Sequence, residues 1–180
     1  MRITKENTIG LVIDIQERLF NVMDEKERLL KNCEILVEGL NVLNIPLLVS
    51  QQYTKGLGET LPEIKKHIPD FSPIEKLDFS CHDVPEIRAK LQELNARNIV
   101  ICGIESHVCV LQTAVDMKDA GLNPIVVMDC VSSRKKESIE LAKYRFHREG
   151  IMTTSYESIL FELTRVAGTD EFKAISKIIK

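Results

Sequence analysis

The stretch "GIESHVCVLQTA", from Gly103 to Ala114, carries a cysteine at a position where a nucleophile could stand. It follows an apolar run and leads into a segment of helical period, so Cys109 should lie in the first turn or so of a helix that follows a strand. Backbone N–H groups at the start of a helix stabilise a thiolate, which is the reactive form of cysteine. The competing interpretation is packing, because free cysteine is among the most buried residue types. The local pattern leaves both roles open for Cys109.

Two charged residues could assist such a nucleophile. Asp14 ends an otherwise apolar run, where a carboxylate is costly unless it is paired or faces a cleft. Lys76 lies between Ile74 and Leu77, so its stem could be partly buried. A buried lysine near a cysteine and an aspartate would favour the charged forms of both. The alternatives are a structural ion pair for Asp14 and a solvated surface charge for Lys76.

The other chemically capable residues give weaker signals. His107 is a natural base for a cysteine, but side chains two residues apart on a helix diverge, which favours a surface or pocket-rim position. Asp129 also ends an apolar run and is either an acid or a cap of a turn or helix. The segment "SCHD" (80–83) matches no closed zinc site, and "QQY" (51–53) offers no strong metal ligand. No phosphate-binding glycine motif is present, which disfavours a nucleotide-binding domain.

These residues must be positioned by the elements around them, and apolar runs of strand length alternate with segments of helical period. Residues 52–82 are the exception, an irregular region with a short helix over 61–68 and a short extended piece. Strands apolar on both faces that alternate with helices predict an α/β fold, a parallel sheet covered on both sides. Ligands bind such sheets at the carboxyl ends of the strands. The expected strands are 9–15, 45–51, 98–103, 123–130 and 151–155, and the expected helices are 24–44, 84–95, 107–120 and 135–149, with one or two more at the C-terminus.

The composition bounds the class of protein. The 180 residues are 44% hydrophobic and 28% charged, which suits one globular domain over 1–180. A net charge of −3 without a basic stripe argues against a nucleic-acid partner. The longest apolar run is far short of the roughly 20 residues that span a bilayer, and "MRITKENTIG" lacks the apolar core of a signal peptide. The five scattered cysteines are therefore expected to be reduced thiols in a cytoplasmic protein.

Taken together, the motifs give the chain a family resemblance. The motifs are "LVIDIQERLF" with Asp14, "EKLDFS" with Lys76, and "GIESHVCVLQTAVD" with Cys109. With them the chain resembles the isochorismatase-like cysteine hydrolases, and "SQQYTKGLG" further resembles the branch called isochorismatase domain-containing proteins. The resemblance implies a Rossmann-like, three-layer α/β/α fold with a six-stranded parallel sheet. It also implies a catalytic triad of Asp14, Lys76 and Cys109.

The same resemblance implies a mechanism. A non-proline cis peptide between Ile104 and Glu105 would turn a backbone N–H toward the pocket, where it forms an oxyanion hole with the N–H of Cys109. Asp14 would accept the thiol proton, and Cys109 would attack an amide, carbamoyl or similar carbon to form a thioester. The expected substrate is a small molecule. Candidate substrate-binding residues are Phe20, Gln51, Tyr53, Phe79 and Glu105.

The chain departs from the family pattern in two respects. Metal-binding nicotinamidases of the family carry Asp and His ligands after the second strand, where this chain has "QQY" (51–53). No catalytic metal, no cofactor and no nicotinamidase activity are therefore expected. Glu105 places a carboxylate where amidases of the family often have a small residue, and it could pair with Lys76 or His107 or select the charge of the substrate. Cys109 itself argues against true isochorismatase chemistry, which proceeds without a nucleophilic cysteine.

Two other functional classes remain as alternatives. A non-catalytic or regulatory member would act through protein contacts. A receiver-like signalling domain would use Asp14 and Asp129, but the acidic pair after the first strand is missing. The resemblance also implies a homo-oligomer, a dimer or higher, and the C-terminal segment could form its interface or cover its own sheet. The apolar residues of that segment are Phe172, Ile175, Ile178 and Ile179.

Overall fold

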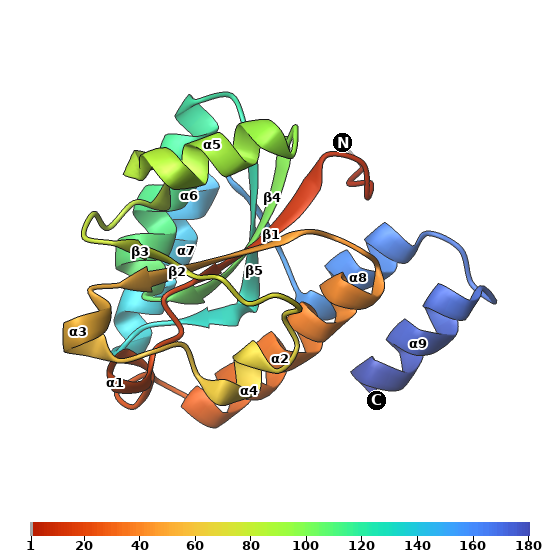
Figure 1. Ribbon diagram of the computed structural model, residues 1–180, viewed down its shortest axis with the longest axis horizontal. Coiled ribbons are helices and arrows are strands. Elements are labelled where there is room, and N and C mark those ends of the chain that lie inside the picture. Colours follow the sequence, from red (N-terminus) through yellow and green to blue (C-terminus); the bar gives the residue numbers. More distant parts are fainter. Residues whose placement is uncertain (1) are drawn as a thin grey trace.

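Six parallel strands form the central sheet of the computed structural model, which describes residues 2–180 (Figure 1). Their spatial order is β3-β2-β1-β4-β5-β6, so the first strand lies at the centre of the sheet. The predicted α/β class with a six-stranded parallel sheet and helices on both sides is confirmed. The strands are β1 (Thr8–Ile13), β2 (Leu47–Gln52), β3 (Ile74–Lys76), β4 (Asn98–Ile104), β5 (Asn123–Ser132) and β6 (Met152–Thr154).

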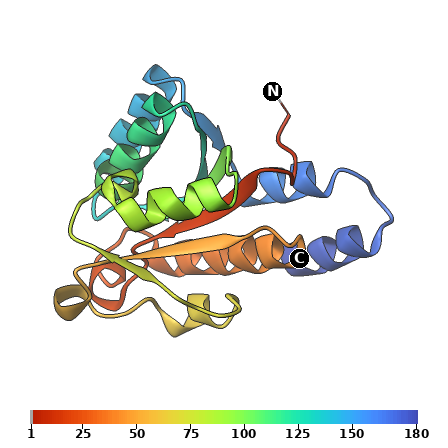
Figure 2. The same cartoon turned by 45° about the horizontal axis from the view of Figure 1, so that its top comes forward.

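Helices cover both faces of this sheet (Figures 1 and 2). One face carries α5 (Pro85–Glu93), α6 (Leu111–Asp119) and α7 (Lys136–Arg148). The other carries α2 (Lys26–Val42) and α8 (Tyr156–Thr164), with α9 (Asp170–Ile179) packed against both. The remaining turns are α1 (Glu17–Phe20), α3 (Thr54–Leu57), α4 (Pro62–Lys65), η1 (Cys81–Asp83) and η2 (Ser106–Val110).

Sequence signals account for most of these boundaries. All six residues of β1 are buried, as expected for a strand covered on both faces. Pro85 begins α5, where a missing N–H is tolerated. Ser155 and Thr169 cap α8 and α9 by accepting hydrogen bonds from backbone N–H groups in the first turn.

Three local predictions need correction. The region after β2, predicted as irregular up to a short helix over 61–68, already contains helix α3. The helix predicted over 107–120 begins as the π-helical turn η2 and becomes α-helical only at Leu111. The first helix was expected at 24–44, but the short helix α1 precedes it, with Gln16 and not Asp14 at its N-cap.

The C-terminal segment covers the protein's own core. Ile175 is completely buried, and Ile178 and Ile179 pack against the same apolar cluster. The rings of Phe172 and Phe161 lie 6.1 Å apart between their centroids, which joins α9 to α8. Of the two roles considered for this segment, the structure shows packing within the chain.

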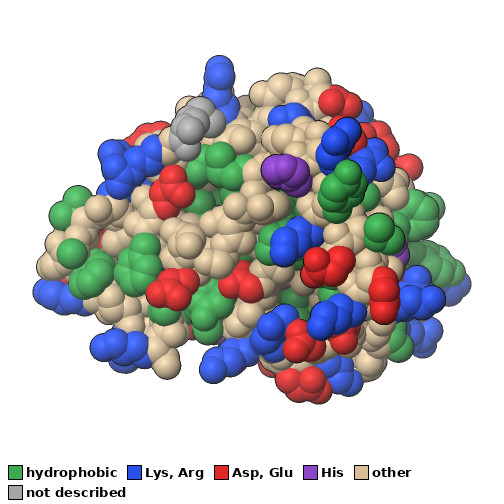
Figure 3. All heavy atoms as spheres, turned by 180° about the vertical axis from the view of Figure 1, so that it is seen from behind, with side chains coloured by type: hydrophobic (Ala, Val, Ile, Leu, Met, Phe, Trp, Pro, Cys, Tyr) green, Lys and Arg blue, Asp and Glu red, His purple; other side chains and the backbone are tan. Residues whose placement is uncertain are grey.

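The outer surface is mixed in charge. Figure 3 shows basic and acidic side chains intermixed over the face seen from behind. Within residues 2–180, no helix combines the length and the apolar character that crossing a membrane requires.

Candidate active site

Asp14 lies directly after β1, at the carboxyl edge of the sheet. Its backbone has a left-handed φ of 52°, and its N–H donates to the carbonyl oxygen of Ser50 at 3.2 Å. The Ser50 hydroxyl donates to Oδ1 of Asp14 at 2.7 Å. Ser50 is in register with Ile13 on the adjacent strand, so sheet pairing brings this hydroxyl to the carboxylate.

Lys76 is the last residue of β3 and reaches the same point from the sheet edge. Its Nζ lies 2.7 Å from Oδ2 of Asp14, and both side chains are completely buried. Nζ also donates to Oε1 of Gln52 at 2.6 Å and to the carbonyl oxygens of Asp78 and Phe79 at 3.2 and 3.1 Å. Burial is the largest single influence and disfavours the ammonium form, but the Asp14 carboxylate together with the thiols of Cys81 and Cys109 outweighs it, and the pKa of Lys76 is raised.

The two oxygens of Asp14 differ in their partners. Oδ1 accepts the Ser50 hydrogen bond, whereas the contact of Oδ2 with Lys76 does not have hydrogen-bond geometry. Within the described residues, Oδ2 therefore has a charge partner but no hydrogen-bond donor. A buried carboxylate oxygen in this state is able to accept a proton.

Cys109 lies in the π-helical turn η2 that follows β4 and is 5% exposed. Burial and the nearby negative charge of Asp14 raise the pKa of its thiol to about 12, although Lys76 acts in the opposite direction. The resting site therefore holds a neutral thiol beside a charged Asp14–Lys76 pair, and attack by sulfur requires a base to take the proton.

Residues that directly follow β5 make the contacts that hold the turn between β4 and Cys109. The peptide bond between Ile104 and Glu105 is cis. The sequence suggests Lys76 or His107 as the partner of Glu105, but Glu105 pairs with neither of them. Instead, its Oε2 accepts hydrogen bonds from the backbone N–H and the Nε of Arg134, each at 3.1 Å. His107 Nδ1 lies 2.8 Å from the hydroxyl of Ser133, so its ring turns toward the β5 end.

Gly103 allows β4 to approach β1 closely. Its φ is +129°, and a Cβ built on it would lie 2.0 Å from the carbonyl oxygen of Ile13. We expect Gly103→Ala to lower the free energy of unfolding by about 3 kcal/mol in urea titrations. Gly121→Ala is the matched control, because Gly121 has a φ of +81° but no atom within 4 Å of the built Cβ. That control should lose only about 1 kcal/mol, and equal losses in both variants would contradict the steric explanation.

The predicted substrate-binding residues divide into buried and exposed ones. Phe20 is 9% exposed and packs in an apolar cluster. The buried Gln51 amide donates to the Thr60 hydroxyl at 2.9 Å. Tyr53 and Phe79 are 49% and 54% exposed, and both are joined to Lys76 through backbone groups. The backbones of the two exposed aromatic residues thus lie next to Lys76.

Two polar residues that contact Asp14 and Lys76 could not be recognised from the sequence. In the sequence, Gln52 is notable only as a weak metal ligand. In the structure, its Oε1 accepts a hydrogen bond from Lys76, and its backbone N–H donates to Oε1 of Gln16 at 2.7 Å. Ser50 was not singled out, although a serine in a buried strand is a polar group that needs a partner. Asp129 proves to be structural, since its Oδ1 accepts the Tyr156 N–H at the start of α8.

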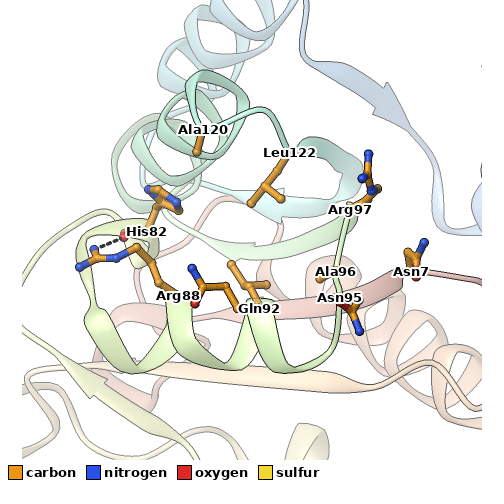
Figure 4. A pocket seen from close by; sticks show the side chains of 10 residues that line it. Asn7, His82, Arg88, Gln92, Asn95, Ala96, Arg97, Ala120 and Leu122 are labelled. Carbon is orange, nitrogen blue, oxygen red and sulfur yellow. Dashed lines mark hydrogen bonds between the residues drawn. The ribbon is translucent and has the colours of Figure 1, made fainter.

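One hollow of the surface lies away from these residues. It has a volume of about 800 Å³ and is bordered by Asn7, Arg97 and Leu122, each directly before a strand. Figure 4 shows Arg88 and His82 on its other side. This hollow is therefore at the amino edge of the sheet, opposite the carboxyl edge that carries Asp14. Within residues 2–180, no three His, Cys, Asp or Glu side chains converge as metal ligands would.

Comparison with known proteins decides the family. The sequence model of the isochorismatase domain matches residues 8–157. This chain belongs to the isochorismatase family. Several curated relatives of this isochorismatase-family chain are named isochorismatase domain-containing proteins, as the motif around Gln51 predicted.

Three relatives illustrate the range of names in the family. The chain is 36% identical to the secreted isochorismatase effector Isc1 of Phytophthora sojae, over 99% of this chain and 87% of that protein. It is 32% identical to mouse isochorismatase domain-containing protein 2A, over 99% of this chain and 85% of that protein. A solved structure described as the MAR1 ribonuclease of Caenorhabditis elegans superposes with a TM-score of 0.93 and 33% identity, covering 99% and 92% of the two chains. The isochorismatase-family fold supports a hydrolase.

Proposed function

We propose that this protein is a cysteine hydrolase that cleaves a small amide, carbamoyl or related C–N bonded substrate. The observation that supports this most directly is the completely buried Asp14–Lys76 pair, which is close enough to Cys109 to shift the pKa of its thiol. A structural ion pair would not need a cysteine beside it at the carboxyl edge of the sheet, where ligands bind.

Activation of the nucleophile follows from the resting protonation states. The Cys109 thiol is neutral near pH 7, since burial and Asp14 raise its pKa to about 12. Asp14 Oδ2, which lacks a hydrogen-bond donor, takes the proton as sulfur attacks. Lys76 remains charged and stabilises whichever of the two groups carries the negative charge.

The remaining steps conserve atoms and protons. The sulfur of Cys109 bonds to the substrate carbon, and the backbone N–H groups of Glu105 and Cys109 hold the oxyanion that forms. The C–N bond then breaks, and the leaving amine takes the proton from Asp14. Water attacks the resulting thioester, giving a proton to Asp14, and the regenerated thiol regains that proton as the acid leaves.

The burial of the site favours a small substrate. Asp14 and Lys76 are completely buried and Cys109 is 5% exposed, so the reacting group of the substrate must enter a narrow space. Tyr53, Leu77 and Phe79 are 49%, 73% and 54% exposed on the segments that carry and neighbour Lys76. We assign substrate binding to these exposed apolar side chains.

The variant Asp14→Asn tests two roles of Asp14 separately: as the base that takes the thiol proton, and as the charge that raises the pKa of the Cys109 thiol. Removing the carboxylate should lower the pKa of the Cys109 thiol below about 12, because the Asp14 charge is one of the causes that raise it. Hydrolysis should nevertheless fall by about 100-fold or more, since no group remains to take the proton. The change in thiol pKa is read from the rate of iodoacetamide labelling at Cys109 between pH 7 and pH 8.5, where the protein is folded, by mass spectrometry, because a lower pKa increases the thiolate fraction at each of these pH values.

Asp129→Asn is the control for this experiment. Asp129 also ends a buried part of a strand, but it binds the Tyr156 N–H and lies outside the triad. It should leave both the thiol titration and turnover unchanged. Full turnover by Asp14→Asn, or an unchanged thiol pKa, would contradict the proposed role of Asp14.

Ribonuclease activity is the second candidate, because the 33% identical Caenorhabditis elegans structure carries that description. The burial of the triad and the net charge of −3 both disfavour a polyanionic polymer as substrate. A substrate screen of small amides, ureides and carbamoyl compounds, with isochorismate and single-stranded RNA as additional arms, decides between these activities. Release of amine or ammonia from a small substrate supports the proposal, and cleavage of RNA alone would overturn it.

A further inference from the structure

The hollow at the amino edge of the sheet has cationic side chains at both of its ends. Arg88 and His82 lie at one end and Arg97 lies toward the other, with Gln92 between them (Figure 4). We call this the amino-edge hollow. Its volume of about 800 Å³ is within the range of sites that bind small molecules. It lies at the edge of the sheet opposite to Asp14, so a ligand bound there occupies a second site, separate from the catalytic one.

Backbone hydrogen bonds fix the position of Arg97 at one end of the hollow. The N–H groups of Arg97 and Asn98 both donate to the carbonyl oxygen of Asn7, at 2.8 and 2.9 Å. The carbonyl oxygen of Arg97 accepts the N–H of Asn123 at 2.7 Å. The starts of β1, β4 and β5 are therefore joined at this residue, and they hold its exposed side chain at the border of the hollow.

The other end of the hollow is formed by α5 and the turn before it. Arg88 is half-buried, and one of its terminal nitrogens donates to the carbonyl oxygen of His82 at 2.6 Å. A guanidinium group has five N–H donors, so this bond leaves most of them available to a ligand. Within residues 2–180, neither Arg88 nor Arg97 forms an ion pair with a carboxylate. Both therefore carry a positive charge that the described chain does not neutralise by direct pairing.

The amino-edge hollow is positive although the whole chain has a net charge of −3. No Asp or Glu is among the described residues that line it. Helices α5 and α6 both end beside it, and each helix end contributes about half a negative charge. Their final turns are closed by the N–H groups of Ala96 and Leu122, which donate to carbonyl oxygens of the helices at 2.9 Å. Two whole charges on two arginines exceed these partial charges, so the hollow favours an anion.

The two cationic ends are separated by an uncharged middle. From Arg88 to the end of α5 the helix rises about 8 Å, and Arg97 lies beyond that end. Leu91 and Ala96 are buried and line the hollow between the ends, and Gln92 adds an amide group. A single anionic group cannot contact both arginines closely over this length. An elongated ligand with an anionic group at each end matches the arrangement.

We propose that the amino-edge hollow binds a small dianion, a molecule with a carboxylate or phosphate group at each end. Guanidinium groups bind both kinds of anion through paired hydrogen bonds, and the ring of His82 and the amide of Gln92 supply further donors. Single-stranded RNA also carries phosphates, but binding along a strand requires a basic groove with aromatic side chains rather than two arginines at the ends of a hollow. This ligand is distinct from the C–N bonded substrate assigned to the catalytic site.

Calorimetric titration with succinate, adipate and phosphoglycolate at low salt tests the proposal. At least one of these dianions should bind with a dissociation constant below about 1 mM, and its monomethyl ester should bind at least about tenfold more weakly. Arg88→Gln and Arg97→Gln should each weaken binding of the same dianion at least about tenfold, because each removes the charge at one end. Comparison of the three probes shows whether carboxylate or phosphate is preferred.

Lys90→Gln is the matched control, since it removes an exposed positive charge from the same helix. Lys90 pairs with Glu93 at 3.0 Å and does not line the hollow, so this variant should keep the wild-type affinity. Asp14→Asn should also keep it, because Asp14 lies at the opposite edge of the sheet. Melting temperatures confirm that each variant folds.

Four results would each overturn the assignment of this second site. They are the absence of any dianion that binds wild-type protein below about 1 mM, binding that neither arginine variant weakens, binding that is lost in Asp14→Asn, and displacement of the dianion by single-stranded RNA at lower concentration than by the dianion itself.

Discussion

Cys109→Ala should reduce turnover of any hydrolysed substrate by at least about 1,000-fold. The variant removes the sulfur that forms the thioester in the proposed mechanism, and Asp14 and Lys76 keep their contact with each other. Alanine fits the apolar cluster in which Cys109 lies, so the fold should persist. Turnover is measured as release of the leaving amine, and trapping by acid quench followed by mass spectrometry detects the acylated cysteine in the wild type.

Cys102→Ala is the matched control for this variant. Cys102 is also a buried cysteine, 1% exposed, but it lies in the apolar cluster on the other side of the sheet. It should lose some stability and keep its turnover. Undiminished hydrolysis by Cys109→Ala, with Cys102→Ala equally active, would remove Cys109 from the mechanism.

The free energy of unfolding should fall steeply between about pH 9 and pH 11. All five cysteines are buried and unpaired, and burial contributes to a raised pKa for every one of their thiols. In the unfolded chain these thiols ionise near pH 8.5. Above that pH the unfolded state binds fewer protons than the native state, so stability decreases as the pH rises.

The size of this effect depends on the number of thiols rather than on how far each pKa is shifted. Each thiol that stays protonated only in the native state lowers stability by about 1.4 kcal/mol per pH unit. Five such thiols lower it by up to about 7 kcal/mol per pH unit, which is comparable with the whole stability of a typical domain. Lys76 acts in the same direction at still higher pH, since its pKa is raised in the native state.

Urea titrations under reducing conditions from pH 7 to pH 10.5 measure this slope. Cys33→Ala and Cys102→Ala should each reduce it by about 1.4 kcal/mol per pH unit, whatever they do to stability at pH 7. A wild-type stability that stays level from pH 8.5 to pH 10 would contradict the raised thiol pKa values.

The fold could be predicted where local sequence determines the element. Strands β1, β4 and β5 are buried on both faces, and their apolar runs mark them in the sequence. Strand β3 has three residues, and its pairing of Lys76 with Gln52 of β2 is a tertiary contact without a local pattern. The π-helical start of the segment before α6 likewise depends on contacts with the β5 end.

The residues of the candidate site could be predicted from the sequence, but most of the contacts between them could not. Asp14 stood out because an acid rarely ends a buried strand, whereas Lys76 gained its role from the family resemblance. The partner of Glu105 could not be predicted, because Arg134 lies 29 residues later and is brought close only by the packing of β4 against β5. The contact of Ser50 with Asp14 could not be predicted for a similar reason, because only the strand register places Ser50 opposite Ile13 and next to Asp14.

Strand β3 forms an edge of the sheet, and Lys76 is its last residue. Short edge strands open at a lower free energy than the centre of a sheet, where β1 and β4 lie. The ion pair with Asp14 therefore joins a short edge strand to the residue that follows a central strand. Under the proposed mechanism, we therefore expect mild denaturant to abolish turnover by detaching β3 while most backbone amides of the sheet centre remain protected from exchange.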